Sequence, residues 1–246
     1  MAVLGSSLRA SFTSSVLAVA CSARRSCVPL IVASAAGPSR NAFSWETAAQ
    51  KHGVEFVGSY SRPIDMPVFP GLPEFTLAGR SNVGKSSALN TLVGGRKKLA
   101  VVSKTPGRTR SINLFKVGKV CTITDLPGYG FAKVSQDMQD DWKRQITTYL
   151  RKREALQLAV LFVDAQRDPQ ELDAQLLDFL EDEGRLASLV VATKTDKLAK
   201  TKLEASLARL HESLALPDGE PLPLSSKTGA GKKELWQRIT AMCSGQ

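Results

Sequence analysis

A short glycine-rich segment in the first half of the chain limits the choice of folds more than any other stretch. It follows the apolar run 75–78, precedes the helical pattern 87–92 and fits GxxxxGK[ST] at every fixed position. Glycines let backbone N–H groups wrap around a phosphate, and the following helix adds the positive end of its dipole. A strand, this loop and a helix in succession predict a phosphate-binding loop. Its residues are Gly79, Arg80, Ser81, Asn82, Val83, Gly84, Lys85 and Ser86.

Two side chains of this loop have expected chemical roles. Lys85 is predicted to neutralise the β- and γ-phosphates of a nucleotide, and the Ser86 hydroxyl is predicted to bind Mg²⁺. The alternative is a chance match in a glycine-rich turn. The flanking strand and helix argue against it, because they supply the context that a phosphate loop requires.

From residue 74 onward, short apolar runs alternate with amphipathic stretches, a rhythm typical of parallel strands joined by crossover helices. We therefore predict an α/β fold with a mostly parallel six-stranded sheet and helices on both faces. The expected strands are Glu74–Ala78, Ile112–Val117, Val120–Thr124, Leu158–Asp164, Leu189–Thr193 and Pro221–Leu224. The expected helices are Lys85–Leu92, Gln136–Arg151, Pro169–Glu183, Lys202–Leu214 and Lys232–Met242.

Composition excludes several classes of protein. The 246 residues include 33 Lys and Arg, 23 Asp and Glu and 43% hydrophobic residues, which suits one α/β domain with an appendage. No apolar run reaches the length of about 18 residues that a membrane-spanning helix needs, so no membrane contact is expected. The four cysteines lack the paired spacing of a zinc ribbon, and a disulfide scaffold is not expected.

The first 40 residues differ in composition from the rest of the chain. They contain four Arg, no Lys and no acid, and they are rich in Ser and Ala. This composition predicts an organelle transit peptide, and its hydroxyl-rich start favours a chloroplast over a mitochondrion. A disordered tail and a secretory signal at Val16–Cys21 are the alternatives. Residues 41–73 are interpreted as a linker or N-terminal extension, whose prolines forbid a long helix and which has room for an edge strand at Val54–Ser59.

A second motif, Asp125-Leu126-Pro127-Gly128, closes the apolar run 120–124. An acid at the end of a strand can hold Mg²⁺ through water, and the Gly128 N–H can contact a γ-phosphate and move when that group leaves. The alternative is that Asp125 only ends the strand in a turn. Its position after a phosphate loop favours the chemical role.

Recognition of the base is predicted at Thr193-Lys194-Thr195-Asp196, after the apolar run 189–192. Asp196 can accept hydrogen bonds from N1–H and the exocyclic amine of guanine, which adenine lacks. The Lys194 stem can lie along the base, although a helix N-cap is an alternative for this segment. The loop Leu224-Ser225-Ser226 is predicted to present backbone N–H groups to guanine O6. The phosphate-loop-like run Thr228–Lys232 is interpreted only as a turn into the last helix.

In this order, GRSNVGKSS, SKTPGRT, DLPGYGFAKV, TKTD and SSKTG resemble the motifs of the EngB-type family of ribosome-assembly GTPases. The resemblance implies a P-loop NTPase G domain over residues 74–246 that binds GDP and GTP with Mg²⁺ and assists maturation of the large ribosomal subunit. It also implies that Thr109 meets Mg²⁺ in the GTP state and joins Lys85 and Gly128 as a catalytic residue. The segment that carries this threonine is Gly107, Arg108, Thr109, Arg110 and Ser111.

Three positions bear on how such a protein would work. Thr193 stands where most GTPases have Asn, so a contact to the base is lost and modest nucleotide affinity is expected. Tyr129 stands where a Ras-like enzyme has the Gln that positions water, so slow intrinsic hydrolysis is expected. Asn82 resembles the position that holds potassium in some GTPases, which adds K⁺ as a candidate cofactor. The alternative is that Asn82 only shapes the loop.

Basic residues follow the phosphate loop and recur in the predicted helix 136–151, which favours contact with RNA phosphates. Solvated charged faces are the alternative. We expect a monomeric, slowly hydrolysing GTP switch that assists assembly of the large subunit of an organellar ribosome, with ribosomal RNA as its partner. A GTP-dependent tRNA-modification factor and a nucleotide-sensing scaffold are the other hypotheses. The basic residues are Arg96, Lys97, Lys98, Lys104, Arg108, Arg110, Lys143, Arg144, Arg151, Lys152 and Arg153.

Overall fold

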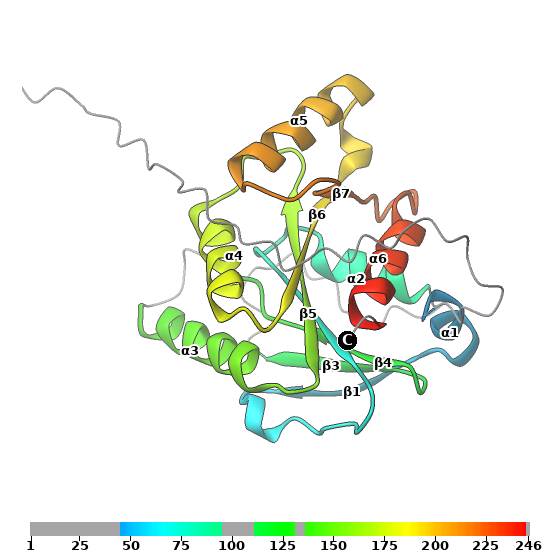
Figure 1. Cartoon of the computed structure of the whole chain (residues 1–246), viewed down its shortest axis with the longest axis vertical. Helices are drawn as coiled ribbons and strands as arrows, with labels where there is room; N and C mark the ends of the chain where they lie inside the picture. The colour runs from blue at the N-terminus through cyan, green and yellow to red at the C-terminus, as the bar shows by residue number, and fades with distance from the viewer. Residues whose placement is uncertain (1–44, 95–110, 131–135, 245–246) are drawn as a thin grey trace, which may run out of the picture. The chain divides into compact units, whose positions relative to one another are not determined.

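The computed structural model describes residues 45–94, 111–130 and 136–244, which form one mixed β-sheet with helices on its two faces (Figure 1). The transit-peptide interpretation of residues 1–40 lies outside the described residues. The helices are α1 (Trp45–His52), η1 (Pro63–Asp65), α2 (Lys85–Val93), α3 (Gln136–Lys152), α4 (Glu171–Glu183), η2 (Thr195–Lys197), α5 (Lys200–Ser213) and α6 (Lys232–Ser244). The strands are β1 (Val54–Tyr60), β2 (Glu74–Gly79), β3 (Ile112–Val117), β4 (Cys121–Asp125), β5 (Leu156–Asp164), β6 (Ala187–Thr193) and β7 (Leu222–Pro223).

The seven strands lie in the order β1-β3-β4-β2-β5-β6-β7. Strand β3 is antiparallel to both of its neighbours, β1 and β4. From β4 to β7 the pairing is parallel, with β2 between β4 and β5. Strand β2 is therefore the middle strand of the seven, and this strand, which precedes the phosphate loop, has a parallel partner on each side.

The two faces of the sheet carry separate hydrophobic cores. One core packs α1, α2 and α6 against the sheet, with Phe75 and Leu77 of β2 facing Leu89 and Trp236. The other core packs α3, α4 and α5 against the opposite face. In Figure 1, α3 and α4 lie on one side of β5 and α2 and α6 on the other. Every residue of β2 is buried, as expected for a parallel strand covered on both faces.

The structure confirms the predicted α/β architecture but corrects the strand count. All six predicted strands form, and Val54–Tyr60 adds a seventh by pairing with β3. The helix α1 was not predicted, because only Trp45, Ala48 and Ala49 of its residues are buried and they give no clear helical pattern. Among the described helices, none combines the length and apolar character needed to cross a membrane.

Arg153 is not part of a basic surface, contrary to the prediction. It is 7% exposed, and its guanidinium lies against Glu74, whose side chain is fully buried, with Nη2 2.9 Å from Oε2. The same guanidinium donates to the carbonyl of Pro67 over 2.7 Å. Glu74 also accepts hydrogen bonds from Tyr149 (2.7 Å) and Thr122 (3.0 Å). These contacts join α3 and the segment after η1 to the central strand.

Replacement of Arg153 with Ala leaves the Glu74 carboxylate buried without its cation, which typically costs about 3–5 kcal/mol. We expect R153A to lower the free energy of unfolding by that amount in urea titrations. The matched control is R151A, because Arg151 is exposed and its pair with Glu183 resembles surface pairs worth at most about 1 kcal/mol. Equal losses in R153A and R151A would contradict a structural role for the buried pair.

Candidate nucleotide-binding site

The predicted motifs meet at one edge of the sheet, where the parallel strands end. The loops after β2, β4, β6 and β7 carry the phosphate loop, Asp125–Gly128, Thr193–Asp196 and Leu224–Ser226. Register aligns the strand ends: Leu77 of β2 lies opposite Asp125 of β4, and Asp164 of β5 lies opposite Thr193 of β6. In open α/β sheets, ligands bind in the crevice at the carboxyl ends of the strands. The fold therefore brings four separate sequence motifs to the place where a ligand is expected.

The phosphate loop depends on glycine at both ends. Gly79 has a φ of 150°, and a Cβ atom there would lie 2.8 Å from the carbonyl oxygen of Phe162. Gly84 has a φ of 111° and immediately precedes α2. Between them, Asn82 adopts a φ of 63°, a left-handed conformation that Asn tolerates better than most residues. The turn directs the chain from β2 into α2, so the N-terminus of that helix lies in the loop.

Lys85 and Asp125, which were predicted to contact phosphate and Mg²⁺ respectively, are in direct contact with each other. They are 7% and 3% exposed, and the Lys85 ammonium pairs with the Asp125 carboxylate. The ammonium also donates to the carbonyl of Leu126. Ser86 follows Lys85 in the first turn of α2 and is partly exposed. The loop and the end of β4 thus place a cation, a carboxylate and a hydroxyl in one region.

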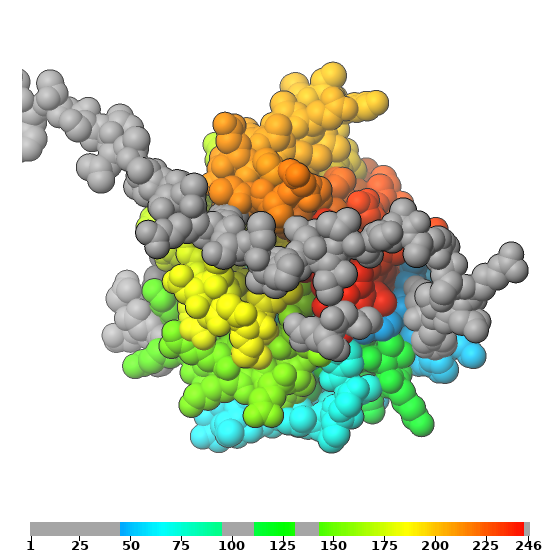
Figure 2. Space-filling model, viewed as in Figure 1, coloured from blue at the N-terminus to red at the C-terminus, as the bar shows by residue number. Residues whose placement is uncertain are grey.

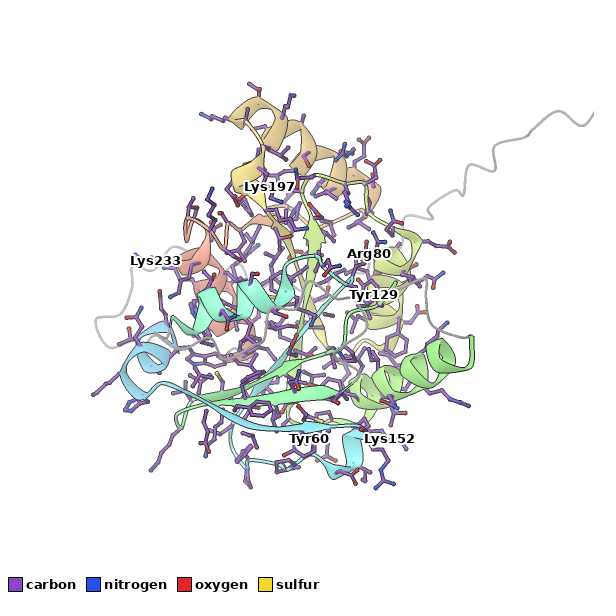
Figure 3. All side chains as sticks on the ribbon, turned by 180° about the vertical axis from the view of Figure 1, so that it is seen from behind. Tyr60, Arg80, Tyr129, Lys152, Lys197 and Lys233 are labelled. Atoms are coloured by element: carbon purple, nitrogen blue, oxygen red, sulfur yellow. The ribbon has the colours of Figure 1, made fainter. Side chains whose placement is uncertain are left out.

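Gly128 and Tyr129 run alongside the phosphate loop. The Ser81 N–H donates to the Tyr129 carbonyl over 2.9 Å, and the Ser81 hydroxyl donates to the Gly128 carbonyl over 3.2 Å. Arg80 and Tyr129 form a parallel β-bridge and lie near one another in Figure 3. A Cβ atom on Gly128 would lie 2.9 Å from the Ser81 nitrogen. Only glycine therefore allows this close approach to the loop.

Thr193 and Lys194 fasten the loop from the other side. The Thr193 hydroxyl lies 2.6 Å from the Val83 carbonyl and 3.0 Å from the Val163 carbonyl. Lys194 donates to the Asn82 carbonyl over 2.8 Å and to Asp164 over 2.7 Å. These bonds hold the base-recognition segment and the phosphate loop at a fixed separation.

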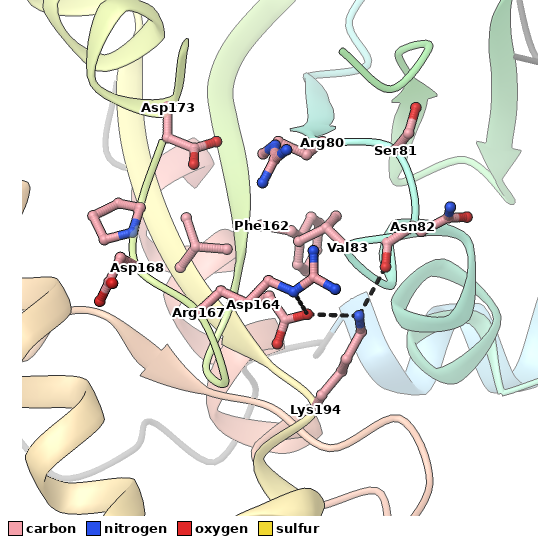
Figure 4. Close-up of a pocket in the computed structure, with 12 residues that line it drawn as sticks. Arg80, Ser81, Asn82, Val83, Phe162, Asp164, Arg167, Asp168, Asp173 and Lys194 are labelled. Atoms are coloured by element: carbon pink, nitrogen blue, oxygen red, sulfur yellow. Dashed lines mark hydrogen bonds and ion pairs between the residues drawn. The ribbon is translucent and has the colours of Figure 1, made fainter. Parts of the chain in front are cut away.

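A pocket of about 170 Å³ opens beside these contacts (Figure 4). Asp164 lies in it between Arg167 and Lys194, and the dashed lines in Figure 4 follow this chain to Asn82. Asp164 was not predicted as a site residue. Its signal in the sequence was an acid at the end of a buried strand, the same signal that identified Asp125.

Asp196 lies at the exposed end of the site and is held by Ser225. The Ser225 hydroxyl, from the loop after β7, donates to the Asp196 carboxylate over 2.7 Å. The Thr195 N–H points to the Leu224 carbonyl at 3.5 Å. The run 228–232 forms a tight turn into α6, in which a Cβ atom on Gly231 would lie 2.0 Å from the Pro223 carbonyl oxygen. The two predicted base-recognition loops are therefore in contact.

Part of the predicted site lies outside the described residues. Gly107, Arg108, Thr109 and Arg110 fall in this part, together with the basic residues 96–104. Ser111 is described and immediately precedes β3. The remaining predicted residues, from Gly79 to Ser226, all lie in the loops at the carboxyl edge of the sheet or at the start of α2.

Known proteins support the same interpretation. A protein-family model described as "50S ribosome-binding GTPase" matches residues 74–194. A "Probable GTP-binding protein EngB" of Natranaerobius thermophilus is 47% identical over 68% of this chain and 86% of its own length. Its namesake from Syntrophus aciditrophicus is 46% identical over 76% of this chain and 93% of its own length.

The fold agrees with these sequence matches. A crystal structure of a probable GTP-binding protein EngB superposes with a TM-score of 0.59 and 28% identity. The superposition covers 70% of this chain and all of that chain. The motif geometry, the sheet order and these similarities lead to one assignment. The chain belongs to the EngB family of GTP-binding proteins, and its P-loop domain is that of a GTP-hydrolysing enzyme.

Proposed function

We propose that this protein is a plastid EngB-type switch that binds GTP with Mg²⁺, hydrolyses it slowly and, as a monomer, assists assembly of the large subunit of the organellar ribosome. The observation that carries the proposal is the set of four loops at the carboxyl edge of the sheet, together with the EngB relatives.

In the proposed chemistry, backbone N–H groups of Asn82–Ser86 bind the phosphates and Lys85 neutralises the charge that develops between the β- and γ-phosphates. Attack of water on the γ-phosphorus breaks its bond to the β–γ bridging oxygen and yields GDP and inorganic phosphate. Gly128 donates its N–H to the γ-phosphate. Asp196, held by Ser225, accepts the two guanine donors. Thr193, Lys194 and Leu224–Ser226 complete the binding surface.

The residues present suit Mg²⁺. Ser86 offers a hydroxyl and Asp125 a buried carboxylate, and oxygen ligands are those that Mg²⁺ prefers. The described residues contain no group of three His, Cys, Asp or Glu side chains arranged to hold a metal. That composition fits an ion that is bound mainly through phosphates and water, with few protein ligands. Bound Mg²⁺ would offset negative charge on the phosphates, and Thr109 is the proposed additional ligand.

Slow hydrolysis is supported by the side chain of Tyr129. It is 6% exposed, and its hydroxyl donates to Asp173 in α4 over 2.6 Å. Burial, together with the neighbouring carboxylate, raises the pKa of Tyr129 well above its usual value, so the hydroxyl stays protonated. A tyrosine fixed in this way is not directed at an attacking water. The position that carries the catalytic Gln in Ras-like enzymes thus supplies no equivalent group here.

The proposed partner follows from the family description, which names binding to the 50S ribosome. Exposed cations provide a surface for phosphate contacts. Helix α3 lies at the surface in Figure 2, with Lys143 and Lys152 exposed. Arg151 is exposed as well but pairs with Glu183. We propose that this face and the basic segment 96–110 contact ribosomal RNA.

The proposed compartment rests on the N-terminal segment. The two EngB relatives are matched over 86% and 93% of their lengths, whereas the matches span only 68% and 76% of this chain. The first 40 residues contain four Arg and no acid. Such a composition suits import into an organelle, and a plastid is proposed because the start of the segment is rich in hydroxyl side chains.

Asp196→Asn tests base recognition. The amide can donate to the O2 of xanthine, but it cannot accept both guanine donors as the carboxylate does. Loss of a hydrogen bond to a charged group costs about 1.5–3 kcal/mol, so GTP affinity should fall about 10-fold or more while XTP affinity rises. Fluorescence titration with both nucleotides measures this change. S225A removes the hydrogen bond to Asp196 and the acceptor of the Thr228 N–H but keeps the Asp196 carboxylate, so it should keep the preference for GTP. An unchanged GTP-to-XTP ratio in D196N would reject the assignment.

Compartment and partner can be tested in cells that contain plastids and mitochondria. Residues 1–45 fused to a fluorescent reporter should enter plastids, whereas the reporter alone should remain cytosolic. The tagged full chain should co-sediment with the large ribosomal subunit on gradients of plastid lysate that contain a non-hydrolysable GTP analogue. A cytosolic fusion would reject import, a mitochondrial fusion would reject the plastid, and a full chain that stays at the top of the gradient would reject the ribosomal partner.

We also propose that Asn82 helps to hold K⁺ beside the phosphates, where a cation would offset charge in the transition state. The Asn82 side chain is exposed, and the backbone carbonyl of Asn82 accepts a hydrogen bond from Lys194. GTP hydrolysis in KCl should exceed that in NaCl of equal ionic strength by about 10-fold or more, below the 10³–10⁵ of an arginine finger. N82A should remove the difference and still bind GDP. Equal rates in both salts for the unaltered chain would eliminate the potassium mechanism.

A further inference from the structure

Tyr129 connects the proposed γ-phosphate contact to a helix on one face of the sheet. It directly follows Gly128, and its carbonyl accepts a hydrogen bond from the Ser81 N–H over 2.9 Å. Its ring is buried in the core formed by α3, α4 and α5. The side chain and the backbone of one residue therefore bind different parts of the protein, α4 and the phosphate loop.

The partner of the Tyr129 hydroxyl is a carboxylate that accepts two hydrogen bonds from the described residues. Asp173 is 3% exposed and accepts from Tyr129 over 2.6 Å through Oδ1. Its other oxygen accepts from the Gln170 N–H over 2.8 Å at the start of α4. The positive end of the helix also stabilises this charge. Figure 4 shows the Arg80 side chain near Asp173. A buried carboxylate held in this way strongly favours keeping its tyrosine donor.

The space around Gly128 makes its position sensitive to small shifts. A Cβ atom on Gly128 would lie 2.9 Å from the Ser81 nitrogen and 3.0 Å from its Cα. On its other side, a Cβ atom on Gly130 would lie 3.2 Å from the Arg80 Nε. The peptide that carries the Gly128 N–H thus lies closely against the loop, and Tyr129, the residue after Gly128, anchors the segment to the core through its buried ring.

We propose that Tyr129 is a positioning residue for recognition of the γ-phosphate. Its hydrogen bond to Asp173 holds the Gly128 peptide against the phosphate loop, where the N–H can donate to a γ-phosphate. The proposal rests on the Gly128 contact given under the proposed function. GDP lacks that phosphate, so the Tyr129–Asp173 bond contributes to binding of GTP and not of GDP. The same bond couples the position of Gly128 to the position of the start of α4.

The chain contains a matched control for this contact. Tyr149 is fully buried, lies in the same core as Tyr129 and donates to the Glu74 carboxylate over 2.7 Å. Tyr129→Phe and Tyr149→Phe each remove one hydroxyl that donates to a buried carboxylate, so both should lower thermal stability. Only Tyr129 lies next to the phosphate loop. Only Y129F should therefore change the ratio of GTP-analogue affinity to GDP affinity.

The experiment measures the affinity of each variant for a non-hydrolysable GTP analogue and for GDP by fluorescence titration with Mg²⁺. We expect Y129F to bind the analogue about 10-fold more weakly and GDP within about twofold of the unaltered chain. D173N, whose amide oxygen can still accept one hydrogen bond, should shift the ratio in the same direction by a smaller factor. Y149F should leave the ratio unchanged.

Gly128→Ala separates this inference from the proposed function. The new Cβ would displace the peptide from Ser81, so G128A should lose affinity for the GTP analogue selectively. One outcome is that G128A loses affinity for the GTP analogue selectively while Y129F and D173N weaken binding of both nucleotides equally or leave both unchanged. In that case the positioning role of Tyr129 is wrong and the Gly128 contact stands. If G128A itself does not distinguish the nucleotides, the Gly128 contact is wrong. If Y149F shifts the ratio as far as Y129F, the effect is general destabilisation and the inference fails.

Discussion

Strand β2 is hydrogen-bonded in parallel on both sides and buried on both faces, and this position determines where the nucleotide site lies. The chain can leave such a strand only at its carboxyl end, between the ends of β4 and β5. There the Phe162 carbonyl of β5 leaves no room for a side chain at Gly79. The loop must therefore turn directly into α2, and the N-terminus of that helix lies near the acid at the end of β4.

The same geometry explains which parts of the site could be predicted. Asp125, Thr193 and Leu224 each follow an apolar run, and the carboxyl ends of parallel strands share one edge, so their proximity follows from local patterns alone. Arg153 shows the limit of that reasoning. Its partner Glu74 lies 79 positions away in the sequence. No local pattern distinguishes a buried arginine from an exposed one, and the sequence therefore suggested a surface residue. Strand β1 was uncertain for a related reason, because it lies at an edge and most of its residues are only partly buried.

Thr193 has a role that comparison with other GTPases did not suggest. From the sequence, the change from Asn to Thr meant only a lost contact with the base. In the structure its hydroxyl, which has one hydrogen to donate, lies within 3.0 Å of the carbonyls of both Val83 and Val163. The side chain thus joins the phosphate loop to the ends of β5 and β6. A loop held in its binding conformation loses less conformational entropy when a ligand binds.

The face of the sheet covered by α3, α4 and α5 contains two buried tyrosine–carboxylate contacts with different surroundings. Glu74 receives donors from Tyr149, Thr122 and the Arg153 guanidinium, so no single bond determines its stability. Within the described part of the chain, Asp173 receives one side-chain donor, Tyr129, and one backbone N–H. When a buried carboxylate has few hydrogen-bond donors, the stability of the region around it depends more strongly on each donor. The contacts of Glu74 thereby fix the part of this core next to α3. The packing next to the start of α4 depends instead on Tyr129, which is adjacent to the phosphate loop. This asymmetry gives the bound nucleotide a physical connection to one helix of the core and leaves the other helix as a fixed support.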